Sequence, residues 1–200
     1  MKENVKIRGY FKIESFDKDG KLLDVFEQHN IVTDVARKAM VHLVAGVVQN
    51  NVINKFILGT KGHQGTDVLT PKTATEGFTS ERKDLFCDTS VVNVDSWNKI
   101  TFTPSGSLID TKAKDVVDGA TNSSTVDVIV DTSVTPTGSE EYSVTYVINI
   151  AQDAFNGTNN GVIYTEAGLW ADDTMFAYRV FKGKIKESSS SLKITWTLIF

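Results

Sequence analysis

The chain has 200 residues, of which 40% are hydrophobic and 23% charged, and its formal net charge is −4 at pH 7. This composition is typical of a globular protein with its own core. The negative net charge argues against general electrostatic binding to nucleic acid or to an anionic membrane. Cys87 is the single cysteine, which excludes an internal disulfide and a metal cage built from thiolates.

The first predicted element is a β-hairpin. Apolar and polar residues alternate over residues 5–13, the sequence DKDG at 17–20 favours a turn, and residues 21–28 indicate the returning strand.

A helix is predicted over residues 32–47, because apolar residues recur there at the spacing of one helix face. The members of this stripe are Val32, Ala36, Ala39, Met40, Leu43, Val44 and Val47. Either Thr33 or Asn30 is suited to cap its first turn, and Asp34 suits the positive end of the helix dipole. We interpret the stripe as core, with docking against a partner helix as the alternative.

The middle of the chain is predicted to alternate between short strands and long loops. A buried strand is expected at 54–60, and further short strands at 89–94, 98–104 and 126–131. Two polar stretches without periodicity, at about 61–84 and 104–123, are predicted to be long loops.

The last third has the clearest alternation. Strands are predicted at 142–150, 161–171, 175–182 and 192–200, with an acidic turn between the second and the third. Together the elements predict a single mainly β domain over residues 1–200, an antiparallel β-sandwich or barrel-like unit with one amphipathic helix near the N-terminus.

Candidates for a chemical site are few. His29, His63 and Asp67 have side chains that can bind a metal ion, but nothing in their spacing indicates a metal site. The sequence has no nucleophile elbow and no phosphate-binding glycine loop. We therefore expect a protein that is not an enzyme and that needs neither a metal nor an organic cofactor.

Glu166 is the acid that stands out, because it interrupts an otherwise apolar strand just before Ala167 and Gly168. A buried carboxylate there would need a donor, from a neighbouring strand or across a subunit boundary. The alternative is that Glu166 faces water on an edge strand.

Several short motifs occur in an order that resembles structural proteins of tailed bacteriophages. They are ILGT at 57–60, LTPKTATEGF at 69–78, EAGLW at 166–170, MFAYRVF at 175–181 and SLKITWTLIF at 191–200. The resemblance extends from about residue 5 to residue 200, and its motifs are short and mostly structural.

The resemblance implies a virion protein made in the host cytoplasm. We expect it to form a homo-oligomer and to dock on other phage virion proteins at the tail, baseplate, tail-fibre attachment region or capsid surface, with neither nucleic acid nor membrane as a partner. The absence of a long repetitive shaft favours an assembly or decoration module over a complete fibre. Interface or core anchors are expected at Glu166, Trp170, Phe176, Tyr178 and Phe181.

A module that binds glycans or a cell surface is the alternative function. Tyr142, Trp170 and Trp196 have rings that could stack on sugars, although all three occupy alternating strand positions that also suit a core.

Overall fold

The computed structural model describes residues 7–47, 52–73, 84–87, 89, 96–102, 110–117, 124–134 and 140–200. Its strands are β1 (Arg8–Asp17), β2 (Leu22–His29), β3 (Ile31–Val32), β4 (Lys55–Gly59), β5 (His63–Gln64), β6 (Asp67–Pro71), β7 (Trp97–Phe102), β8 (Asp110–Val117), β9 (Thr125–Val134), β10 (Glu140–Ile150), β11 (Val162–Ala171), β12 (Thr174–Lys186) and β13 (Ser190–Ile199). One helix, α1 (Asp34–Val44), lies near the N-terminus.

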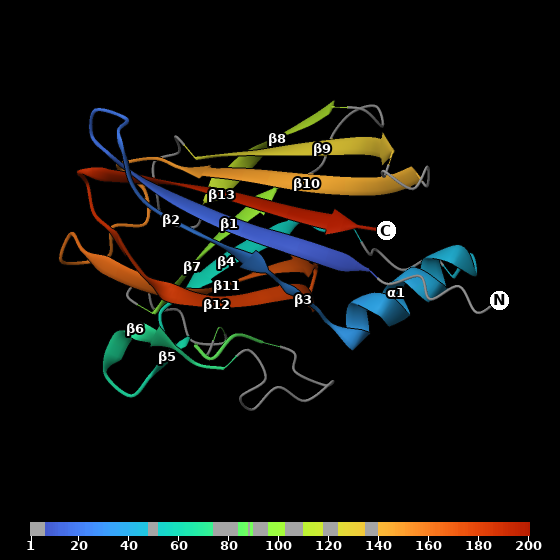
Figure 1. Ribbon diagram of the computed structural model, residues 1–200, viewed down its shortest axis with the longest axis horizontal. Helices are drawn as coiled ribbons and strands as arrows, with labels where there is room; N and C mark the ends of the chain where they lie inside the picture. The colour runs from blue at the N-terminus through green and yellow to red at the C-terminus, as the bar shows by residue number, and fades with distance from the viewer. Residues whose placement is uncertain are drawn as a thin grey trace.

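The strands form two large antiparallel sheets (Figure 1). One sheet has the order β2-β1-β13-β10-β9-β8, and the other has the order β7-β4-β11-β12-β3. The pairing of β7 with β8 joins the sheets at one side, and at the other side the chain passes from β2 through Asn30 into β3. The prediction of a mainly β sandwich with one helix near the N-terminus is confirmed.

The main core lies between the two sheets, and aromatic side chains meet at its centre. The ring of Trp196 from β13 lies 4.8 Å from that of Phe11 and 6.4 Å from that of Phe56, measured between centroids. All three side chains are fully buried. Because side chains alternate across a strand, the same strand presents Lys193, Thr195 and Thr197 on the opposite face.

The alternation over residues 192–200 predicts one buried face made of Leu192, Ile194, Trp196, Leu198 and Phe200. This prediction holds for the first four, all of which are buried. It is wrong for Phe200, which is 40% exposed. Phe200 lies one residue beyond β13, where its backbone N–H still donates to the carbonyl of Tyr142 at 2.9 Å. Backbone pairing thus continues past the point at which the facing sheet covers the side chains.

A second, smaller core lies on the outer face of the β4-β11-β12 sheet. Its buried members are Ile57, Leu85, Cys87, Trp170, Met175, Tyr178 and Val180. Strand neighbours of these residues, such as Phe56 and Leu169, belong to the main core, so the two clusters lie on opposite faces of one sheet. Residues 84–87 cover this outer face. Gly168 is required beneath Trp170, because a Cβ there would lie 2.5 Å from the indole ring.

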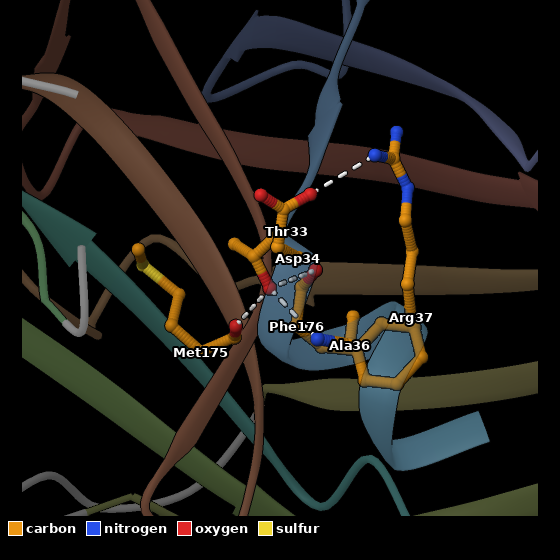
Figure 2. Close-up of polar contacts among 6 residues, drawn as sticks. All are labelled: Thr33, Asp34, Ala36, Arg37, Met175 and Phe176. Carbon is orange, nitrogen blue, oxygen red and sulfur yellow. Dashed lines mark hydrogen bonds and ion pairs between the residues drawn. The ribbon is translucent and has the colours of Figure 1, made fainter. Parts of the chain in front are cut away.

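Helix α1 begins at a cap that also ties it to β12 (Figure 2). Thr33 Oγ1 accepts a hydrogen bond from the N–H of Ala36 at 3.1 Å and donates to the carbonyl of Met175 at 2.7 Å. Arg37 pairs with Asp34 one turn away, at 3.0 Å. Of the two predicted caps, Thr33 is the one used, since Asn30 lies outside the first turn and its N–H bonds the carbonyl of Gly9.

The helix is shorter than predicted and its apolar stripe is only partly covered. Val32, Ala36 and Ala39 are buried, whereas Val44 is 89% exposed. The predicted helical residues 32–33 are extended or capping residues, and Val47 lies beyond the end of the helix and is exposed.

The two stretches predicted as long loops contain strands. Strands β5 and β6 form a small separate hairpin inside the first stretch, and β8 lies inside the second. The loop prediction is therefore wrong for these strand residues, which pair although their sequences lack apolar alternation. The remainder of the second stretch, residues 74–83 of the first, and residues 90–94 of the strand predicted at 89–94 lie outside the described residues.

Candidate functional site

Glu166 lies in the middle of a sheet and is fully buried. Strand β11 has β12 on one side and β4 on the other, so it is not an edge strand. The side chain of Glu166 points to the outer face of this sheet, where Trp170 belongs to the second core. This placement excludes the alternative in which Glu166 faces water at an edge.

The carboxylate of Glu166 accepts three hydrogen bonds from backbone N–H groups. Oε2 accepts from Phe86 at 2.7 Å, and Oε1 accepts from Cys87 at 2.9 Å and from Lys61 at 3.2 Å. These donors come from two segments that are distant from Glu166 in the sequence. One carboxylate therefore holds residues 84–87 and the start of the 61–71 segment against the sheet.

Neighbouring residues make room for this arrangement. A Cβ at Gly59 would lie 2.5 Å from Cys87 Sγ and 2.8 Å from Glu166 Oε1, so no side chain fits there without displacing both. Next to Glu166, the hydroxyl of buried Thr165 accepts a hydrogen bond from the N–H of Gly62 at 2.9 Å. We call the set of Glu166, Thr165 and the backbone groups that they hold the carboxylate clamp.

The clamp contains two ionisable groups, the Glu166 carboxyl and the Cys87 thiol, and their pKa values suit a structural role. Burial raises the pKa of the Glu166 carboxyl above its usual range, while the N–H groups of Phe86 and Cys87 act in the opposite direction. Burial, and then the neighbouring carboxylate of Glu166, raise the pKa of the Cys87 thiol far above its usual value. A thiol that stays protonated is a poor nucleophile, so this pair is not arranged for attack on a substrate.

The other four expected anchors are all buried in the described chain. Phe176 and Phe181 belong to the main core, and Trp170 and Tyr178 belong to the second core. Within one chain these side chains fill the two cores and are not available on the surface.

Of the three metal candidates, His63 and Asp67 lie in the β5-β6 hairpin, whereas His29 lies at the end of β2. The His29 ring lies against Tyr10 at the surface, with 4.4 Å between centroids, whereas His63 Nδ1 lies 3.4 Å from the hydroxyl of Thr165. Asp67 is engaged within its own hairpin by the N–H of Leu69. Among the residues that the structure describes, no three His, Cys, Asp or Glu side chains gather at a common point where they could hold a metal ion.

An open hollow of about 610 Å³ lies beside the ring pair of Tyr10 and His29. Glu27, Gln28 and Arg179 are the other described residues that line it. The guanidinium of Arg179 donates to the carbonyl of His29 at 2.9 Å and also contacts the side chain of Gln28, which fixes β12 to the end of β2. Sequence patterns did not point to this hollow, because its residues come from three strands.

No family model, curated protein or solved structure matches this chain. In the described ranges no helix is both long enough and apolar enough to cross a membrane.

Proposed function

We propose that this chain is a non-enzymatic structural protein of a tailed-bacteriophage particle, which self-associates and docks on another particle protein at the tail, the baseplate or the capsid surface. The proposal is supported first by the resemblance of residues 166–170, 175–181 and 191–200 to phage structural proteins. These motifs lie in β11, β12 and β13, the strands that contribute most of the aromatic residues in the two cores. The features that carry the resemblance are therefore the ones that build the fold.

The observation that carries the proposal is the uncovered apolar surface at the end of α1. Val41 is 66% exposed and Val44 is 89% exposed, and residues three apart on a helix are neighbours on its surface. Val47 and Val52, which follow the helix, are also exposed. We take the pair of Val41 and Val44 as the candidate contact site, because a partner that covers exposed apolar side chains removes their surface from water.

The clamp supports a structural role as well. Glu166, the only buried carboxylate among the described residues, accepts its hydrogen bonds from the protein's own backbone. It thereby fixes the shape of an outer face, which is what a repeating assembly requires.

We expect the wild-type protein to form a homo-oligomer at micromolar concentration, measured by light scattering after size exclusion. Replacing Val44 with lysine should lower the measured mass without lowering the melting temperature, because Val44 makes little contact within its own chain. Lys18→Glu is the control, since Lys18 is exposed in the turn between β1 and β2, away from α1, and it should keep the oligomer. A wild-type monomer across this concentration range contradicts self-association.

A glycan-binding module is the second candidate, and the hollow beside Tyr10 and His29 is the observation that favours it. Burial of Trp170 and Trp196 removes two of the three rings expected to stack on sugars, whereas Tyr142 is 52% exposed. A monomer that is retained on a glycan array, and that loses this retention in the Tyr10→Ala variant, would favour this candidate over the first.

A further inference from the structure

Lys186, at the end of β12, is a fully buried lysine whose hydrogen-bond acceptors in the described chain are all neutral oxygen atoms. Its Nζ donates to the side-chain Oδ1 of Asn156 at 2.6 Å and to the carbonyls of Gln152 and Glu187, each at 3.1 Å. Buried lysines are rare and are usually paired with a carboxylate. The surroundings of Lys186 therefore call for a chemical explanation.

The loop between β10 and β11 presents Asn156 to Lys186 in a fixed orientation. Asn156 Nδ2 donates to the carbonyl of Gln152 at 2.8 Å, which leaves Oδ1 facing the amine. The residue before it, Phe155, has a left-handed φ of 61°, and its carbonyl accepts a hydrogen bond from the buried Tyr164 hydroxyl at 3.0 Å. The loop is thus tied to the core on one side of Asn156.

The reacting atoms are close. A C=O bond is about 1.2 Å long, so Nζ of Lys186 lies within about 3.8 Å of Cγ of Asn156. Atoms held near 3–3.5 Å in a suitable orientation are close to the geometry of attack, and the upper limit for this pair lies only slightly beyond that range.

The chemistry of the two groups suits a condensation. Burial lowers the pKa of Lys186 to about 8, so part of the population carries a free amine near neutral pH. The negative charges of Asp153 and Glu187 act on the pKa of the same amine in the opposite direction.

We propose that Lys186 and Asn156 form an intramolecular isopeptide bond. The lone pair of neutral Nζ attacks Cγ of Asn156, a proton passes from Nζ to Nδ2, and the Cγ–Nδ2 bond breaks. Ammonia leaves, and an amide joins Nζ to Cγ. The step needs no oxidant and no co-reactant, and it links the end of β12 covalently to the loop that precedes β11. It does not depend on the proposed function.

Intact mass spectrometry of the full chain tests the bond, after the folded protein has been held at pH 8, where the amine is partly free. The expected mass is that of the sequence less one ammonia, and proteolysis should yield a branched fragment that contains both residue 156 and residue 186. Lys186→Arg keeps a positive charge but removes the nucleophile, so it should have the full sequence mass. Asn156→Ala should also have its full sequence mass.

Asn156 precedes Gly157, and an Asn-Gly pair can itself lose ammonia by closing a succinimide ring. That product would survive in Lys186→Arg, would hydrolyse in mild base and would leave no branched fragment. The branched fragment in the wild-type protein therefore decides the matter even if a variant folds poorly. A wild-type chain at full mass, or an ammonia loss without the branched fragment, overturns the proposal.

Discussion

Replacing Glu166 with alanine is expected to lower the free energy of unfolding by about 2–4 kcal/mol, since a buried N–H left without a partner costs about 1–3 kcal/mol and a partly buried one costs less. The substitution deprives the N–H groups of Lys61, Phe86 and Cys87 of their shared acceptor. Relief from burying the carboxylate, whose pKa is raised by desolvation, offsets part of this loss. Residues 84–87 should then separate from the outer face of the sheet.

Glu166→Gln removes the charge of the side chain but keeps its shape, so it tests the two contributions separately. Its amide oxygen can still accept from Lys61 and Cys87, but its NH₂ group would meet the N–H of Phe86, donor against donor. We therefore expect an intermediate loss. Urea unfolding measures both variants, and the reaction rate of the Cys87 thiol with a disulfide reagent reports on the cover formed by residues 84–87. In the native wild type the thiol should be protected, because it is buried and its pKa is raised. If both variants keep the wild-type stability and a protected thiol, then the clamp does not hold residues 84–87 against the sheet.

Trp196→Ala is expected to cost about 3–5 kcal/mol, the usual loss when a buried aromatic side chain is truncated in a core. Trp196 is fully buried against Phe11 and Phe56, which belong to opposite sheets, so the cavity would open between the two layers. This loss is a large part of the 5–15 kcal/mol that stabilises a typical domain.

Two controls accompany this variant. Trp196→Phe keeps an aromatic ring in place and removes an indole N–H that is buried without a hydrogen-bond partner, so it should cost far less. Thr195→Asn changes the outer face of the same strand and should alter stability by about 1 kcal/mol or less, the span of β-propensity. Thermal and urea unfolding measure all three. If Trp196→Ala melts like the wild type, β13 does not form part of the core.

Periodicity predicted most strands, because one face of each is buried against the opposite sheet. Phe11 and Ile13 in β1 and Leu192 to Leu198 in β13 follow this pattern. For α1, periodicity overestimated how much of the apolar stripe is buried. An apolar stripe shows which side chains avoid water, but it does not show which part of the molecule covers them. Val44 is apolar and belongs to the stripe, yet the described chain leaves it exposed.

The partners at the clamp could not be predicted, although Glu166 itself stood out. Its donors are backbone N–H groups, which every residue except proline carries, so the identities of Lys61 and Phe86 contain no information about the contact. Lys186 was also missed. A lysine followed by Glu187 and four serines has the composition of an exposed turn, and only the folded loop around Asn156 shows that its amine is enclosed.

We propose that the chain is a structural component of a phage particle, and this can be tested on the particles themselves. The test is mass spectrometry of particles purified by density-gradient sedimentation from a lysate of the cells that produce the chain. We expect its peptides to sediment with the particles through a high-salt wash, in a fixed ratio to the most abundant particle protein. Recovery of the chain only in the soluble fraction, with none in intact particles, would contradict the claim.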